Sequence, residues 1–128
     1  MKDKPVFAPE LAIPNGLKDI SFYIDAFGAE ELRRFSNDDG TIHVSELSIN
    51  GAMFHLHEQT LHSGLHSLAG GTHSVVIGLF VADVHAVIEQ AVAAGAKITS
   101  PVQDYDYGYR QGSIEDPFGH RWQIQKSI

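Results

Sequence analysis

A turn-and-strand motif near the C-terminal end, repeated more weakly half a chain earlier, is the feature that most constrains the fold. The segment Asp116–Gly119 has the composition of a tight turn, because Pro117 presets the first corner and Gly119 accepts a backbone conformation that a side chain resists. From His120 onward, apolar and polar residues alternate, which predicts a strand with one packed face. The same pattern follows Gly51, 68 residues before Gly119.

A second pair of positions shows the same repeat. Gly28 and Gly95, 67 residues apart, each end a helical pattern and lead into a strand, as glycine does at helix C-termini. Two copies are too few for a solenoid of stacked repeats. We therefore expect two similar modules in one domain over residues 1–128, with module 1 at about 5–58, a linker at about 59–72 and module 2 at about 73–128.

Each module is expected to contain a strand, a helix and three further strands, so the fold class is α+β with two βαβββ modules. Hydrophobic periodicity, the helix cap Asp83 and the hairpin dipeptide Asn50-Gly51 set the boundaries. For module 1 the pattern predicts strands over 6–13, 32–36, 42–49 and 52–57 and a helix over 17–26. For module 2 it predicts strands over 73–81, 97–100, 109–115 and 120–126 and a helix over 83–94, whose packed face is Val84, Val87, Ile88 and Val92.

The composition limits the classes of function. A chain of 128 residues can bury a core as one domain, and without cysteine it has no disulfide, thiolate nucleophile or cysteine-bound metal. A net charge of −7 argues against binding to the phosphates of nucleic acid. No apolar signal segment follows the N-terminus, and no apolar run approaches the roughly 18 residues of a membrane span. We therefore expect a cytoplasmic protein that binds neither membrane nor nucleic acid.

Several segments, by their order and spacing, resemble the vicinal oxygen chelate superfamily of glyoxalases, extradiol dioxygenases, fosfomycin resistance enzymes and bleomycin resistance proteins. Within this superfamily the chain is most similar to the PhnB-type, glyoxalase-like branch. The matching segments are Pro9–Leu11, Phe22–Glu30, His43–Leu47, Val81–Val84, Ala91–Lys97 and Asp116–Trp122. The resemblance implies a homodimer in which curled mixed sheets surround one small-molecule cavity per subunit.

The resemblance also implies which side chains line the cavity, because the last strand of each module faces it. The residues that it places there are His55, His57, Gln123 and Gln125. In metal-dependent relatives one ligand lies at about His55, a carboxylate at about Gln123, and one ligand on the first strand of each module. Glu10 or Ala8 would occupy the first-strand position of module 1, depending on the strand register.

The sequence departs from the metal-binding pattern in module 2. Gln123 is an uncharged amide, which binds a divalent cation more weakly than a glutamate does. The spacing puts Ile77, which has no ligand atom, at the first-strand position, and His73 lies four residues too early. If a divalent ion such as Zn, Ni, Mn or Fe is bound, we expect Glu10, His55 and Gln123 to hold it.

A tyrosine-rich loop is the other candidate for ligand binding, because it matches the family's aromatic-Gly-x-Arg loop over the cavity mouth. Its tyrosines are Tyr105, Tyr107 and Tyr109. These rings would wall a site for a flat or apolar molecule, and the guanidinium of Arg110 would bind a carboxylate or phosphate. Alternatively, Arg110 pairs with Asp106 or Glu115 and only fixes the loop.

Three functions remain open. The first is a metal-free small-molecule binder similar to bleomycin resistance proteins, in which the tyrosines, Arg110 and Gln125 recognise the ligand and the two histidines are neutral parts of a wet pocket. The second is a metal-dependent lyase, isomerase, transferase or dioxygenase with His57 as general base, since imidazole titrates near neutrality. The third is an interaction module whose vestigial cavity is filled by side chains. The weak ligand at Gln123 and the lack of a ligand at Ile77 favour the first.

Overall fold

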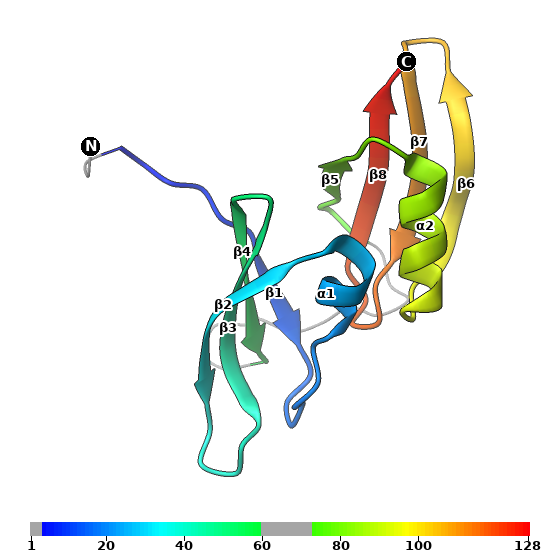
Figure 1. The fold of residues 1–128 in the computed structure, drawn as a ribbon. Helices are drawn as coiled ribbons and strands as arrows, with labels where there is room; N and C mark the ends of the chain where they lie inside the picture. The colour runs from blue at the N-terminus through cyan, green and yellow to red at the C-terminus, as the bar shows by residue number, and fades with distance from the viewer. Residues whose placement is uncertain (1–3, 60–72) are drawn as a thin grey trace. The chain divides into compact units, whose positions relative to one another are not determined.

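The computed structural model of the chain describes residues 4–59 and 73–128, which form two compact units (Figure 1). The first unit contains the described residues 4–19 and 29–59, and the second contains 20–28 and 73–128. The stretch 20–28, which the sequence pattern assigns to module 1, therefore belongs to the second unit by its contacts. The expected linker over about 59–72 lies, apart from Gln59, outside the described residues.

The first unit is a four-stranded mixed sheet. Its strands are β1 (Glu10–Ile13), β2 (Glu30–Ser36), β3 (Ile42–Ile49) and β4 (Ala52–Glu58), in the order β1-β4-β3-β2. β1 runs parallel to β4, and the other neighbours are antiparallel. Asn50 and Gly51 join β3 to β4 with φ angles of 50° and 87°, the positive values that a two-residue hairpin favours. The hairpin predicted at these residues is confirmed.

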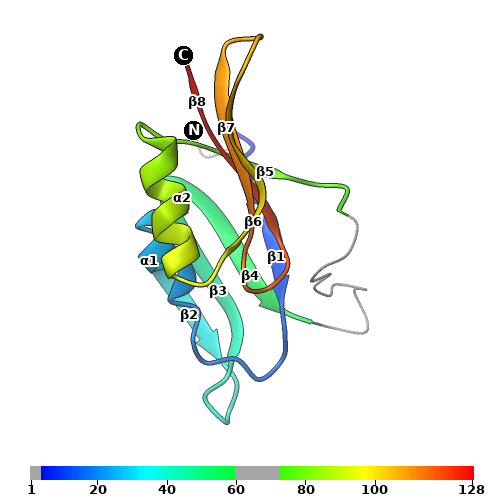
Figure 2. The same cartoon turned by 90° about the vertical axis from the view of Figure 1, so that its right-hand side faces the viewer.

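The second unit repeats this topology and adds helices. Its strands are β5 (Ile77–Phe80), β6 (Lys97–Tyr105), β7 (Tyr109–Glu115) and β8 (Arg121–Ser127), in the order β5-β8-β7-β6 with β5 parallel to β8. Helices α1 (Phe22–Phe27) and α2 (Val84–Ala93) contact each other, and α2 lies along one face of β6–β8 (Figure 2). Asp83 caps α2 as predicted, because its side chain accepts a hydrogen bond from the Ala86 amide at 3.0 Å. In the described part of the chain, no helix is long and apolar enough to cross a membrane.

The predicted α+β class, with two similar modules built on mixed sheets, is confirmed, and neither four-stranded sheet closes into a barrel. The repeat seen in the sequence is also a repeat of strand register. Glu10 lies opposite His55 in the first sheet, and Gly78 lies opposite Gln123 in the second. Both members of the second pair follow those of the first by 68 residues, the spacing of the two glycine turns.

Two elements of module 1 begin later than predicted. The first strand starts at Glu10 rather than at residue 6, because Pro9 has no amide hydrogen to donate to a ladder. The carbonyl of Pro9 still accepts a hydrogen bond from the His55 amide at 2.9 Å. The helix is Phe22–Phe27 rather than residues 17–26. Its predicted first turn is absent because the carbonyl of Leu17 accepts a hydrogen bond from the Ile42 amide at 2.8 Å, which holds this segment to the sheet.

In module 2, the first strand is shorter and less buried than predicted. β5 starts at residue 77, and the preceding Val75 and Val76 are 68% and 54% exposed, so the apolar run from residue 73 is not a buried strand. The packed face of α2 also differs by one position. Ala91 is buried where Val92 was expected, and Val92 is 42% exposed.

β6 is longer than the predicted strand over 97–100. It continues through Pro101 to Tyr105. Its pairing with β7 is irregular between Ser100 and Gln103, so the missing amide hydrogen of Pro101 interrupts no regular ladder.

A buried carboxylate joins the parts of the second unit. Asp116 follows β7 and is 3% exposed. Its Oδ2 accepts hydrogen bonds from the Tyr23 hydroxyl of α1 at 2.6 Å and from the Trp122 indole of β8 at 3.0 Å. Its Oδ1 accepts hydrogen bonds from the amides of Phe118 and His120. These bonds replace the water that the carboxylate loses on burial, so the turn motif of the sequence also fastens α1 to β8.

We expect Asp116→Asn to lower the free energy of unfolding by about 2–4 kcal/mol, because an amide nitrogen cannot accept the hydrogen bonds from Tyr23 and Trp122. Urea denaturation followed by circular dichroism measures the loss. Asp106→Asn, the same change at an exposed position between β6 and β7, is the control and should stay within about 0.5 kcal/mol. Equal losses in the two variants would contradict the role given to Asp116.

Ionisation of the Tyr23 hydroxyl should make the free energy of unfolding depend on pH in the alkaline range. Burial first, and then the charge of Asp116, raise the pKa of Tyr23 well above its ordinary value of about 10. The folded state holds this proton more tightly, so the associated stability is complete below about pH 10 and is lost as the pH rises further. We expect urea midpoints to fall above about pH 10, and to fall less in Tyr23→Phe than in the control Tyr105→Phe. Parallel pH profiles for both variants would contradict this assignment.

Candidate ligand-binding face

Tyrosine and glutamine side chains from neighbouring strands lie together on one face of the second unit's sheet. Residues that pair across a sheet point to the same side. The pairing of Gln111 with Gln125 and of Tyr109 with Tyr105 therefore places these side chains on one face. Gln123 joins them because it lies two residues before Gln125 on β8. Trp122 and Ile124, which alternate with these glutamines along β8, are apolar, buried and on the other face.

The three tyrosines of the predicted loop form an aromatic stack in which Tyr107 lies on Tyr109 at an interplanar angle of 26° and Tyr105 is tilted by 48° against Tyr107. The ring of Tyr107 lies beside those of Tyr105 and Tyr109, with centroid distances of 5.4 and 5.9 Å. Phe80 meets Tyr109 edge-on at 5.8 Å. These spacings are typical of favourable aromatic pairs. Tyr107 and Phe80 are 62% and 60% exposed, so the stack offers aromatic surface to solution.

Glutamine amides form a chain beside this stack. The Oε1 atom of Gln125 accepts hydrogen bonds from the Nε2 atoms of Gln111 at 2.7 Å and of Gln123 at 2.9 Å. The Oε1 atom of Gln111 in turn accepts one from the Tyr107 hydroxyl. The Nε2 atom of Gln125 therefore points over Gly78, where no side chain fills the space. Among the described residues, this Nε2 and the Oε1 of Gln123 have no hydrogen-bond partner, so the face presents one free amide donor and one free acceptor.

Arg110 is paired on the opposite face of the sheet. Its Nε and Nη2 donate hydrogen bonds to Oδ1 and Oδ2 of Asp104 at 2.7 and 3.1 Å. The hydrogen bond from Arg110 lowers the pKa of the Asp104 carboxyl. The anticipated partners Asp106 and Glu115 are not the ones found, because cross-strand register puts Asp104 directly opposite. An anionic ligand would have to displace Asp104 in order to bind Arg110.

In the first unit, strand register brings Glu10 and His55 together. They lie opposite each other on β1 and β4, and Glu46 of β3 lies opposite His55 on its other side. The Nε2 atom of His55 is buried, lies 3.9 Å from Oε2 of Glu46 and has no hydrogen-bond partner among the described residues. Of the two first-strand residues considered, Glu10 and not Ala8 is therefore the one opposite His55.

The other histidines lie outside this row. His57 shares a face of β4 with His55 but lies opposite Val44, and its Nδ1 is 2.6 Å from the carbonyl oxygen of Glu58. His73 precedes β5, and its Nε2 bonds to the carbonyl of Gly119 in the turn before β8. His73 therefore helps to fix that turn.

The residue equivalent to Glu10 in module 2 is Gly78 and not Ile77. Gly78 pairs with Gln123 as Glu10 pairs with His55, whereas Ile77 points to the other face. The prediction was wrong by one residue because it counted back from the start of α2, and a shift of one reverses the face of a strand residue. Gly78, like Ile77, has no ligand atom.

Sequence reasoning missed Phe80 and Gln111. They lie opposite Gln125 on its two sides. The signal that identifies them is the register between neighbouring strands. Alternation along a single strand cannot supply it.

The profile of the glyoxalase/bleomycin resistance protein/dioxygenase superfamily matches residues 11–124. An uncharacterized protein of Mycobacterium bovis is 34% identical to the chain over 130 residues, which cover 98% of this chain and 85% of that protein.

Solved structures share the fold over almost the whole chain. TioX from Micromonospora sp. ML1 is 27% identical, with a TM-score of 0.70, covering 98% of this chain and 100% of that one. A glyoxalase-related enzyme from Fulvimarina pelagi is 22% identical with a TM-score of 0.74, covering 97% and 88% of the two chains. The fosfomycin resistance protein FosX from Mesorhizobium loti is 11% identical with a TM-score of 0.70, covering 98% and 93%. At identities of 22% and 11%, the similarity to the last two structures shows the fold alone.

Two glycines on opposite faces of this sheet allow a matched test of the arrangement. A Cβ at Gly78 would lie 2.8 Å from Nε2 of Gln125, the end of a flexible side chain, whereas a Cβ at Gly112 would lie 2.5 Å from Cδ1 of Ile88 on α2. We expect Gly112→Ala to cost about 1–3 kcal/mol through overpacking, and Gly78→Ala to cost less than about 1 kcal/mol. Gly78→Ala should instead shift the NMR signals of the glutamine side-chain amides. An unchanged amide spectrum in that variant would contradict the amide chain.

Proposed function

Because the chain belongs to the glyoxalase/bleomycin resistance protein/dioxygenase superfamily, we propose that it binds a small, flat organic molecule without a metal ion. The proposed binding surface is the tyrosine and glutamine face of the second unit, and the proposed activity is sequestration of the molecule. The observation that carries the proposal is an exposed aromatic stack beside an amide donor and acceptor that lack partners among the described residues.

The aromatic stack favours a flat ligand. Tyr105, Tyr107, Tyr109 and Phe80 present ring faces and edges in series, and each aromatic contact contributes about 0.5–1.5 kcal/mol beyond the area that it buries. The side chains next to these rings are the uncharged Gln111, Gln123 and Gln125, and the charged pair Glu115 and Arg121 at the other end of the same face is joined by an ion pair at 3.4 Å. A neutral aromatic molecule therefore matches the face better than a charged one.

The amide chain favours a ligand with its own amide edge. The Oε1 atom of Gln125 holds two hydrogen bonds, so rotation of this amide would break both of them. Its Nε2 is thereby fixed as a donor, and the Oε1 of Gln123 remains an acceptor. A carboxamide or lactam offers the complementary carbonyl oxygen and N–H group. Because the amides are already ordered, little conformational entropy is lost on binding.

A metal-dependent enzyme is the competing hypothesis, and the buried, unpartnered Nε2 of His55 among the described residues favours it. The donor set is nevertheless short. Glu10 and His55 are strong ligands, but the carboxylate of Glu46 in the same row is paired with Arg33 at 3.6 Å. Gln123 is an amide already bonded to Gln125, and Gly78 has no ligand atom. Catalytic zinc sites use three protein ligands and keep one position open. These residues do not complete such a set.

Isothermal titration calorimetry with naphthalene-, quinoline- and indole-carboxamides tests the proposal, with the matching carboxylates as control ligands. We expect the carboxamides to bind, and Tyr107→Ala and Gln125→Leu each to weaken binding at least about tenfold, since each removes a contact of about 1.4 kcal/mol. Arg110→Ala changes the opposite face and should leave carboxamide affinity unchanged. Binding of the carboxylates alone, lost in Arg110→Ala, would overturn the proposal in favour of an anionic ligand.

Elemental analysis distinguishes the competing enzyme hypothesis. The protein is expressed with added Zn, Ni, Mn and Fe and purified without chelator or histidine tag. About one metal ion per chain that is lost in His55→Ala would overturn the metal-free proposal. If neither probe nor metal binds, an interaction module becomes the better explanation. Light scattering on the same samples measures the homodimer that we expect.

A further inference from the structure

We propose that the first unit carries a separate site for a zinc-like divalent cation, bound by the Nε2 atoms of His43 and His57. His43 is the second residue of β3, and His57 is the last but one of β4. Their ring centroids are 5.0 Å apart, with an interplanar angle of 66°. Neither residue belongs to the row of Glu10, His55 and Glu46, so the site shares no ligand with that candidate donor set.

Glu58 fixes the tautomer of both imidazoles. The Nδ1 of His43 lies 2.6 Å from Oε2 of Glu58, and the Nδ1 of His57 lies 2.6 Å from the main-chain carbonyl oxygen of Glu58. Carboxylate and carbonyl oxygens only accept hydrogen bonds, so each Nδ1 carries the proton. In the neutral ring this leaves a lone pair on Nε2. Metal-binding histidines are commonly oriented by this kind of bond from the other ring nitrogen.

The spacing of the rings suits a shared ion. When two imidazoles bind the same tetrahedral zinc ion with Zn–N distances of about 2.1 Å, their ring centroids lie roughly 5 Å apart. The centroids of His43 and His57 are separated by this distance. Within the described residues, neither Nε2 makes a hydrogen bond. The side chain of His43 is 48% exposed, so an ion from solution can reach it.

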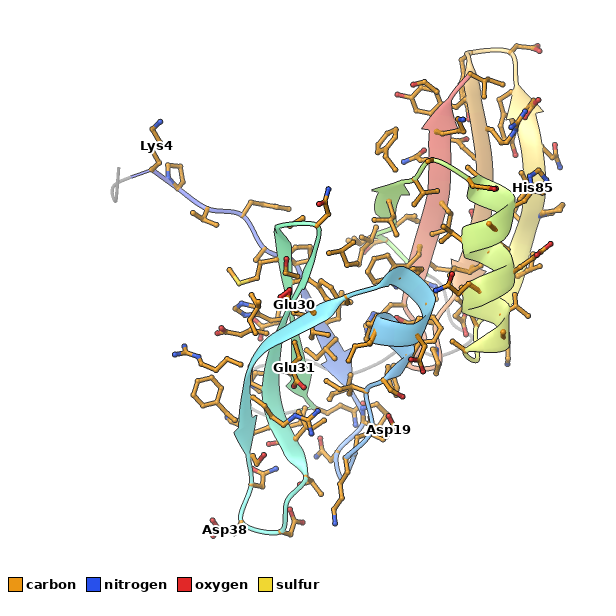
Figure 3. The ribbon with its side chains drawn as sticks, viewed as in Figure 1. Lys4, Asp19, Glu30, Glu31, Asp38 and His85 are labelled. Atoms are coloured by element: carbon orange, nitrogen blue, oxygen red, sulfur yellow. The ribbon has the colours of Figure 1, made fainter. Side chains whose placement is uncertain are left out.

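Residues of the hairpin between β2 and β3 support Glu58. The Nδ2 of Asn37 donates to the two carboxylate oxygens of Glu58 at 3.2 and 3.3 Å and to the hydroxyl of Thr41 at 3.0 Å. Thr41 in turn donates to Asp39 at 2.6 Å, and Asp38 lies at the tip of the same hairpin (Figure 3). The negative charges of Glu58, Asp38 and Asp39 at this end of the sheet also favour the binding of a cation.

The ligand chemistry selects the class of ion. Imidazole nitrogen suits Zn²⁺, Cu²⁺ and Ni²⁺, whereas Mg²⁺ and Ca²⁺ prefer oxygen ligands. Two protein ligands leave positions of a tetrahedral ion open to water or to another molecule. The site is therefore one for an exchangeable ion.

Calorimetric titration of the chelator-treated full chain with ZnCl₂ tests the site. We expect one Zn²⁺ per chain, with affinity at least about tenfold lower in His43→Ala and in His57→Ala, and about tenfold lower in Glu58→Gln. His85→Ala is the matched control, because His85 is an exposed histidine on α2 (Figure 3) and its loss should leave the affinity unchanged. Excess Mg²⁺ should not compete.

Absence of zinc binding, or an affinity unchanged in His43→Ala, would overturn the proposal. Loss of the same binding in His55→Ala or His85→Ala would overturn it too, since the ion would then lie elsewhere. Circular dichroism and thermal melting establish that each variant is folded. His43→Gln, which keeps a polar side chain at this exposed position, should lose zinc as His43→Ala does.

Discussion

In the second unit, α1, the turn after β7 and β8 meet at the carboxylate of Asp116. A helix of six residues is too short to be stable by itself, so α1 depends on what it contacts. The bond from Tyr23 to Asp116 fixes its position, and the rings of Tyr23 and Phe27 pack on Trp122 with centroid distances of 5.9 and 4.7 Å. A charged group at the centre of an aromatic cluster thus organises the apolar side of this unit.

Apolar and polar residues alternate along β8, so this one strand contributes both to that apolar side and to the face proposed to bind a ligand. Trp122 and Ile124 are buried, while Gln123 and Gln125 point the other way into the amide chain. Any rotation or slip of β8 would disturb both faces together, because neighbouring side chains on a strand are fixed to opposite sides. The interactions that stabilise the fold are therefore also those that order the amides before a ligand arrives. Pre-organisation of this kind favours affinity without additional contacts.

Much of this arrangement could be predicted from local patterns. The strands Ile42–Ile49 and Tyr109–Glu115, the Asn50-Gly51 hairpin and the Asp83 cap have their determinants within a few neighbouring residues. Errors arose where a distant partner decided the outcome. The first turn of the predicted helix was lost to a hydrogen bond between Leu17 and Ile42.

The candidate site was predicted less completely for the same reason. The tyrosines and Gln125 were expected at a ligand site from the resemblance to the superfamily, but Gln111 and Phe80 are defined by lying opposite Gln125 on other strands. The pairing of Arg110 with Asp104 is likewise a matter of register. Periodicity shows which residues share a face of one strand and gives no information about which residue of the next strand lies alongside.

The assignment of α1 to the second unit has a consequence for how the chain folds. The sequence repeat divides the chain between its two modules, whereas the contacts of residues 20–28 join part of the first module to the second unit. A fragment made of residues 73–128 would keep its four strands and α2 but would leave Asp116 without Tyr23. Because one chain carries both Tyr23 and Asp116, the docking of α1 onto the second unit is a step of intramolecular folding.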